Sequence, residues 1–241
     1  MPSNLVIPRE YADVLDWAAV VRNPDETEKM YRHIIVYNTP ISSSPPDFSQ
    51  VVVHIQGFVA KLNLHPLGDW NPSTGHGGAV SAKQYIALID CNVPAPFEAQ
   101  VKALNHLIGA KGIRLERKVF TRGSPKGAVK SALLPGDDLT GKARSMEPSW
   151  YVKDKLVVQE QQNGVVVQRN HAVIKAGDFV DVSLVLQVQK RPPATRPRVR
   201  VDLAMREIVL LQARSEIYKK YLKETRGEGS QVSGGEDAMS G

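Results

Sequence analysis

The sequence of 241 residues contains a single cysteine, Cys91, so no disulfide within the chain can brace its fold. A lone cysteine fits a protein of a reducing compartment. The N-terminus shows no basic segment followed by an apolar run, which is the pattern of a secretory signal. No apolar run approaches the ~18 residues of a membrane-spanning helix. We therefore predict an intracellular protein, of the nucleus or cytoplasm, that does not enter a membrane.

Motifs for a metal, a cofactor or a known kind of catalysis are also missing. No two histidines have the spacing of a zinc site, and His65, Asp69 and His76 share only a loop. The Gly-His-Gly-Gly string at 75–78 lacks the Lys and Ser or Thr of a phosphate-binding loop. We expect no metal and no cofactor. An enzyme with a dispersed site around the 65–82 loop stays open as a third alternative, because catalytic groups need not be neighbours in sequence.

Aromatic residues are scarce as well, at 6% of the chain. Scarce aromatic residues are needed first in the core, because each one buries a large apolar surface. Trp150 and Tyr151 stand together in a polar stretch, where a core role is less evident. Unpaired bases stack on exposed aromatic rings. These two residues are therefore candidate stacking platforms.

Basic residues outnumber acidic ones, 31 to 25, which gives a formal net charge of +6. The excess gathers in residues 111–130 and in residues 190–206, the second of which contains three prolines. A basic hairpin tip can follow a phosphate backbone, because each contact releases counterions. The alternative is a solvated tip that discourages pairing between sheet edges. The candidate phosphate contacts are Lys190, Arg191, Arg196, Arg198 and Arg200 at the tip, and Lys118, Arg122 and Lys126 in a second strip.

The second half of the chain carries the clearest strand patterns. Apolar residues alternate with polar ones through Phe179–Gln189, as in a strand with one buried face. Asn163-Gly164 separates two β-rich runs and predicts a tight hairpin, because both residues tolerate positive φ. A second alternating run starts at Val199 and breaks at Glu207–Leu211, which suggests a bulge. Val51–Leu64 is a further long strand, with Gly57 as its expected bend.

Helices are expected at three places. Residues 1–30 show helical spacing of Tyr11, Val14, Ala18 and Val21. Pro94–Gly109 has an apolar face and a proline suited to a first turn, and Ala213–Lys223 is basic and amphipathic. The domain prediction has three parts: a helical segment over 1–30, one β-rich domain over 31–223 with long loops at 65–82 and 121–150, and a disordered tail over 224–241.

About eight strands with one embedded helix and flanking helices predict a mainly β fold. The favoured architecture is an antiparallel OB-like barrel, and a jelly-roll sandwich is the alternative. The string GDFVDVSLVLQVQK, then RVRVDLAMREIVLL, then a short helix, resembles the last hairpin and trailing helix of single-strand-binding OB domains. It also resembles uncharacterised proteins of mushroom-forming fungi. The resemblance covers about the last 70 residues and implies a non-enzymatic nucleic-acid binder.

Three hypotheses for function follow. The first is binding of single-stranded DNA or RNA through the basic hairpin and the neighbouring strip. The second is a structural or assembly protein, such as a capsid-like subunit or an oligomeric scaffold, in which the same basic segments serve as interface charge. A homo-oligomer is compatible with both. The third is the enzyme with a dispersed site.

Overall fold

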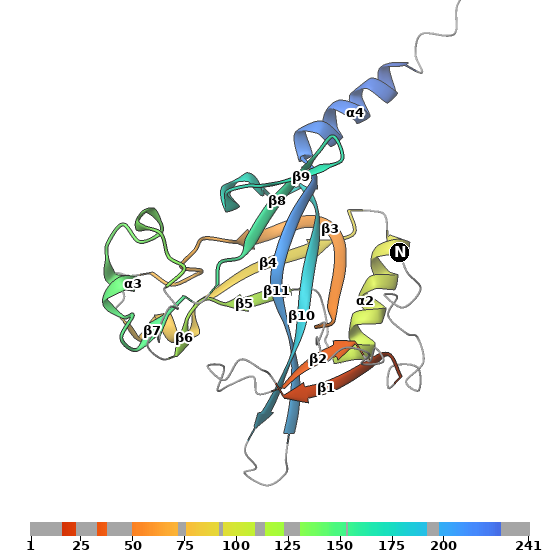
Figure 1. Cartoon of the computed structure of the whole chain (residues 1–241). Coiled ribbons are helices and arrows are strands. Elements are labelled where there is room, and N and C mark those ends of the chain that lie inside the picture. The colour runs from red at the N-terminus through yellow and green to blue at the C-terminus, as the bar shows by residue number, and fades with distance from the viewer. Residues whose placement is uncertain are drawn as a thin grey trace, which may run out of the picture.

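The computed structural model describes residues 16–22, 33–37, 50–71, 76–91, 94–108, 114–122, 131–152, 154–191 and 198–227 (Figure 1). Nine strands form one sheet in the order β1-β2-β10-β3-β4-β5-β11-β8-β9, and β10 also pairs with β11. These strands are β1 (Ala18–Arg22), β2 (His33–Tyr37), β3 (Val52–Asn63), β4 (Lys83–Ile89), β5 (Arg114–Lys118), β8 (Val157–Gln162), β9 (Val165–Gln168), β10 (Phe179–Arg191) and β11 (Arg198–Gln212). The predicted mainly β class is confirmed.

Five of these strands pair in a closed circuit. β10 pairs with β3, β3 with β4, and β4 with β5, all antiparallel. β5 then pairs with β11 in parallel at one position, Ala204 with Glu116, and β11 returns to β10. The expectation of a wholly antiparallel arrangement is wrong at β11, which also runs parallel to β8. Two parallel neighbouring strands need a long connection from the end of one to the start of the other. β5 and β11 are far apart in sequence, as are β8 and β11, so the chain provides such a connection in both cases.

The β10–β11 hairpin is the longest pairing of the sheet, from Phe179 with Gln212 to Arg191 with Arg198. Its alternation places Val182, Leu184 and Leu186 in the interior, as the sequence pattern predicts. The register of this pairing shifts at two places in β10, between Phe179 and Val180 and between Ser183 and Leu184. The break in the β11 pattern is therefore confirmed as bulges. The Asn163-Gly164 turn is confirmed as well, with φ of 51° and 81°.

Gly57 serves a different purpose from the expected bend. The irregularity of β3 falls between Val59 and Lys61, whereas Gly57 keeps its pairing with Val180. A Cβ on Gly57 would lie 2.8 Å from Cε2 of Phe97, on helix α2 (Pro94–Ile108). The missing side chain therefore lets α2, the predicted embedded helix, approach the sheet closely.

The N-terminal helix prediction is wrong over Ala18–Arg22. These residues form β1, which pairs with β2 along its whole length. Ala18 and Val21 fit a helical period, but β-branched Val20 and Val21 also suit a strand, and pairing with β2 decides between them. Residues 11–15 lie outside the described part. The C-terminal helix α4 spans Arg214–Gly227, which extends it beyond the predicted end and into the segment expected to be disordered.

A small lobe stands beside the sheet, at the left in Figure 1. It is built from the β3–β4 connection with 3-10 helix η3 (His76–Ser81), and from α3 (Lys142–Ser145), β6 (Thr121–Arg122) and β7 (Trp150–Tyr151). Trp70 and Phe120 meet edge to face at its centre, 5.5 Å apart. The two predicted long loops therefore share a core of their own. Within the described residues, no helix is long and apolar enough to cross a membrane.

Candidate nucleic-acid interface

The adjoining strands β4 and β5 present a polar outer face. Gln84, Ile86 and Leu88 point into the core, so Lys83 and Tyr85 point outward. Register brings these outward residues opposite those of β5: Lys83 faces Lys118, and Tyr85 faces Glu116. Side chains directly opposite each other on one face of an antiparallel pair are close enough to interact. The two strands therefore assemble one continuous surface from distant parts of the chain.

Tyr85 and Arg114 form the centre of this surface. The guanidinium carbon of Arg114 lies 4.1 Å from the centroid of the Tyr85 ring, which is a cation–π contact. Arg114 Nε also donates to Glu116 Oε1 at 3.0 Å, and the Lys83 ammonium donates to the other carboxylate oxygen of Glu116. Two cations thus share one carboxylate, so the group keeps a net positive charge.

Further basic side chains extend the same face. Lys61 on β3 pairs in register with Ala87 on β4, and its side chain is exposed. Lys118, at the end of β5, is exposed too. We call this surface the β4–β5 face, and it comprises Lys61, Lys83, Tyr85, Arg114, Glu116 and Lys118. Four basic groups and one acidic group around a tyrosine ring are suited to an anionic ligand that contains planar rings.

The basic hairpin tip lies only partly within the described structure. The backbone of Lys190 and Arg191 belongs to β10, and that of Arg198 and Arg200 belongs to β11, so the sheet extends to the tip. The side chains of these four residues lie outside the described part, as does Arg196 entirely. In the second strip, Lys118 joins the β4–β5 face, and the backbone of Arg122 pairs with Trp150. The side chain of Arg122 and all of Lys126 lie outside the described part.

The two aromatic candidates occupy the small lobe. Tyr151, in strand β7 of the lobe, is only 4% exposed. A buried ring offers no face to a base in this conformation. Trp150 is half-buried and packs against the lobe core, so part of its ring is accessible. Of the pair, Trp150 is the more exposed.

Arg117 is basic but belongs to the fold. Its guanidinium donates to the backbone carbonyl oxygen of Asp154. Burial lowers the pKa of Arg117, and the nearby Asp154 carboxylate opposes that shift. Its position across from the outward residues of β5 explains why the basic strip read from the sequence divides between two sides of the strand.

Sequence reasoning missed Tyr85 and Arg114. Tyr85 sits in a strand whose partner is more than 25 residues away in sequence, so its neighbours depend on register. The period-two pattern of residues 83–89, with Lys83 and Tyr85 on one side and Gln84 and Ile86 on the other, was the available signal. It points to an outward tyrosine, though not to the arginine above it.

A second polar group lies on the outer side of β3 and β10. His54 Nδ1 lies 2.7 Å from Asp181 Oδ1, and Gln56 Nε2 donates to Asp181 Oδ2 at 2.9 Å. Ser183 Oγ lies 3.4 Å from the same His54 nitrogen, so the arrangement is not that of a serine nucleophile and its base on opposite ring nitrogens. Among the residues that the structure describes, no three His, Cys, Asp or Glu side chains gather to hold a metal ion.

No protein-family model matches the chain, and no curated protein matches it. Among solved structures it is similar to the single-stranded DNA-binding protein from bacteriophage Enc34. The C-terminally truncated form is 11% identical with a TM-score of 0.29, over 80% of this chain and 95% of that chain. The same protein in complex with single-stranded DNA is 13% identical with a TM-score of 0.30, over 66% and 86%. A third structure is 11% identical with a TM-score of 0.28, over 81% and 90%.

Identities and TM-scores this low transfer neither residues nor a function from the phage protein to this chain. The fungal resemblance is not shown by these comparisons. The chemistry of the β4–β5 face therefore has to be argued from its own side chains.

Proposed function

We propose that this protein binds single-stranded DNA or RNA across the β4–β5 face and the basic tip of the β10–β11 hairpin. The observation that carries the proposal is the outward tyrosine Tyr85, covered by Arg114 and bordered by Lys61, Lys83 and Lys118. Single strands are held by basic side chains that follow the phosphates and by aromatic rings on which bases stack. This face supplies both.

The circuit of five strands supports the choice of surface. We interpret β3, β4, β5, β10 and β11 as the five strands, in chain order, of an OB-like barrel. OB folds bind oligonucleotides on the face of their second and third strands and on the loops that join strands one to two and four to five. Here these elements are the β4–β5 face, the 64–82 connection of the small lobe, and the β10–β11 tip.

The arrangement of Arg114 suggests how binding proceeds. Its guanidinium occupies the ring face of Tyr85 that a base would need. A phosphate arriving beside Glu116 would draw Arg114 into a charge-assisted hydrogen bond and free the ring for stacking. The Lys83 and Arg114 pairs with Glu116 are more than a third exposed on the basic side, so they are weak enough to be exchanged for phosphate contacts.

The remaining predicted residues have roles in the same scheme. Lys190, Arg191, Arg196, Arg198 and Arg200 would contact phosphates at the tip of the β10–β11 hairpin. Lys118, Arg122 and Lys126 would continue the path toward the small lobe, where Trp150 offers a second ring. Binding of this kind needs no cofactor or metal.

Fluorescence anisotropy with a labelled single strand of about 30 nucleotides tests the proposal. Tyr85→Ala should weaken binding about tenfold or more, since a stacked base contributes about 1–3 kcal/mol. Arg144→Gln, which removes an exposed cation of the small lobe's helix α3, is the matched control and should leave the affinity within about twofold. Equal affinity of the Tyr85→Ala variant and the wild type would remove the β4–β5 face as the site.

A further inference from the structure

Helix α4 stands clear of the sheet. It leaves the end of β11 and points away from the body of the protein (Figure 1). Tyr218 and Tyr221 are each 61% exposed, which is unusual for two aromatic residues one turn apart. The helix therefore carries two aromatic side chains whose surface is mostly exposed.

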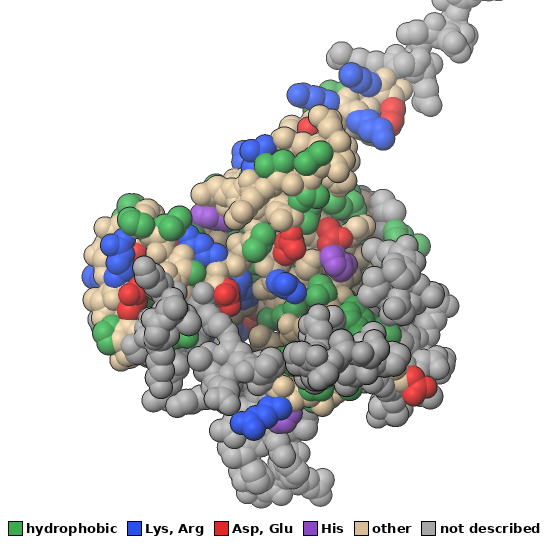
Figure 2. All heavy atoms as spheres, viewed as in Figure 1, with side chains coloured by type: hydrophobic (Ala, Val, Ile, Leu, Met, Phe, Trp, Pro, Cys, Tyr) green, Lys and Arg blue, Asp and Glu red, His purple; other side chains and the backbone are tan. Residues whose placement is uncertain are grey.

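The apolar residues of α4 share one side. Ile217 and Tyr221 are four residues apart, as are Tyr218 and Leu222, so these pairs stack along the helix. The opposite side is charged, with Glu216, Lys219, Lys220 and Lys223. Figure 2 shows the Lys and Arg side chains along this helix. A helix with one apolar and one charged side is built to pack against something along the apolar side.

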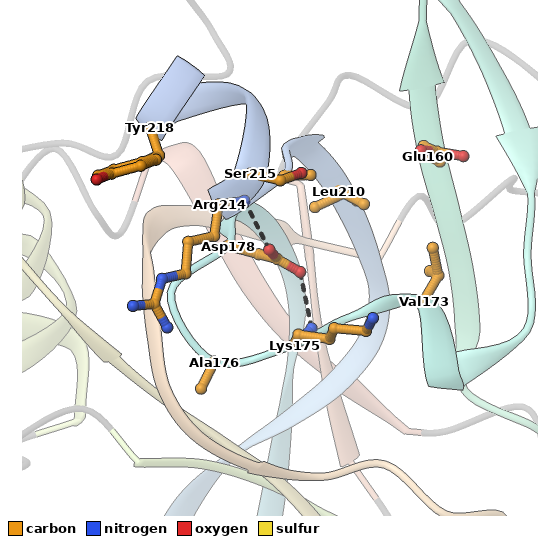
Figure 3. Close-up of a pocket in the computed structure, with 10 residues that line it drawn as sticks. Glu160, Val173, Lys175, Ala176, Asp178, Leu210, Arg214, Ser215 and Tyr218 are labelled. Carbon is orange, nitrogen blue, oxygen red and sulfur yellow. Dashed lines mark hydrogen bonds between the residues drawn. The ribbon is translucent and has the colours of Figure 1, made fainter. Parts of the chain in front are cut away.

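Two charges frame the apolar side. Arg214 lies one turn before Tyr218, and in Figure 3 both side chains point to the same side of α4, away from Asp178. Glu224 borders the other end, near the C-terminal turn. We call the set Arg214, Ile217, Tyr218, Tyr221, Leu222 and Glu224 the α4 stripe. Its basic end and its acidic end are opposite in sign, so the stripe is complementary to its own reversed copy.

We infer that the α4 stripe is the contact surface for a second copy of this chain, with the two α4 helices antiparallel. A two-fold axis near the middle of the helix, between Lys219 and Lys220, sets Tyr218 opposite the partner's Tyr221. The same axis sets Ile217 opposite the partner's Leu222. Such a contact is isologous, because each copy offers the same patch.

Charge complementarity favours this occupant. The axis brings Arg214 beside the partner's Glu224 and the carbonyl end of the partner's helix, where a cation is stabilised. Both copies make this contact, and all three lysines stay in solvent. A nucleic acid held through its phosphates alone would instead engage the lysine side and leave the tyrosines uncovered. Two helices of about four turns bury less than the roughly 1,200–2,000 Å² of a standard interface, so the dimer is a weak one.

Sedimentation equilibrium of the full chain, without nucleic acid and over a range of concentrations, tests the inference. The wild type should show a reversible monomer–dimer equilibrium. Tyr218→Ser combined with Tyr221→Ser should raise the dimer Kd about tenfold or more, because central aromatic anchors dominate such contacts. The matched control, Lys219→Ser with Lys223→Ser, alters the opposite side and should leave the Kd within about twofold.

A charge exchange makes the test specific for the antiparallel arrangement. Arg214→Glu and Glu224→Arg should each weaken the dimer, and the two together in one chain should restore it, since both contacts are then re-formed with reversed signs. A protein that stays monomeric into the high micromolar range would overturn the inference. A dimer insensitive to the tyrosine and charge variants would overturn it equally. Neither result depends on whether the β4–β5 face binds nucleic acid.

Discussion

The carboxylate of Asp178 accepts a hydrogen bond from the backbone N–H of Arg214 at 2.8 Å, across 36 residues of chain. Its other oxygen accepts from the backbone N–H of Lys175 at 2.7 Å, and both bonds are drawn in Figure 3. The side chain is buried and lies beside a hollow of about 620 Å³ at the base of α4. Asp178 thus satisfies an N–H at the first turn of α4 and fixes the start of the helix to the turn that precedes β10.

Asp178→Ala should therefore destabilise the protein by about 1–2 kcal/mol, the usual loss for a helix-capping carboxylate. Two backbone donors would lose their partner at a partly buried position, and α4 would lose its anchor. Thermal unfolding followed by circular dichroism measures the effect. Asp178→Asn keeps one acceptor oxygen, so its unfolding midpoint should lie between those of Asp178→Ala and the wild type. A midpoint unchanged in Asp178→Ala would show that α4 is held by other contacts.

Gly68 should tolerate substitution far less well than Gly141, although their φ angles of 63° and 69° are nearly equal. A Cβ on Gly68 would lie 2.6 Å from the backbone oxygen of Lys83, whereas a Cβ on Gly141 would meet nothing within 4 Å. Gly141→Ala should cost about 1–2 kcal/mol from backbone strain alone. Gly68→Ala should cost clearly more, because β4 cannot yield. Denaturant titration of the two variants gives the difference, and equal losses would contradict the described packing of the lobe against β4.

Stability should fall as the solution is acidified below neutral pH. Burial lowers the pKa of His171 from its ordinary 6.5, and the neighbouring His65 adds to the shift. The unfolded chain then binds a proton more readily than the folded protein. The contribution of His171 to the free energy of unfolding is therefore fully present above about pH 6.5 and declines as pH falls below it. Urea unfolding at several pH values shows the decline, and His171→Gln should flatten it between about pH 5 and 7.

Asp137 should add a second decline at lower pH. Burial alone would raise its pKa, but the hydrogen bond from Lys155 and the backbone N–H of Leu134 outweigh burial and lower it below the ordinary 3.8. The folded protein thus favours the charged form. Its contribution is present above about pH 3.8 and is lost as pH falls through the lowered value. Asp137→Asn should reduce the acid-induced loss, and an unaltered acid limb would contradict the pairing with Lys155.

β9 should be a source of aggregation. Among the described strands it pairs with β8 alone, and Val165, Val166 and Val167 are all exposed. An uncharged, open strand edge is a template for pairing between molecules. Val166→Lys should raise the temperature at which light scattering begins and change stability little. Leu139→Lys, at an exposed position outside any strand, is the control and should not share the effect.

The parts of the fold that sequence could predict are those set by local patterns. The Asn163-Gly164 turn, the alternation of β10 and the helix at Pro94–Ile108 each follow from neighbouring residues. Strand β1 was missed because the spacing of its apolar residues fits a helix as well as a strand, and only its pairing with β2 decides between the two. The parallel contact of β5 with β11 was missed because it joins residues almost 90 positions apart in sequence.

The candidate site also contains residues that local sequence patterns reveal and residues that only the strand register reveals. The abundance of basic residues near Lys118 is visible in the sequence, whereas the placing of Arg114 on the outer face and of Arg117 on the opposite side of β5 depends on register. Tyr85 can be recognised as a site residue only when the strand register and the position of Arg114 over its ring are known. Tyr151 was chosen for its polar neighbours in sequence, but it is buried, and its strand pairs with Thr121, which is 30 positions earlier in the chain.

The most direct test of the proposed function is a titration of the wild-type protein against a labelled single strand, by fluorescence anisotropy, at about 50 mM and about 200 mM salt. We predict a Kd in the micromolar range or tighter at the lower salt concentration, weakened by about tenfold or more at the higher one, because several phosphate contacts release counterions. No binding at the lower salt concentration, or an affinity that salt does not change, would contradict single-strand binding by this protein.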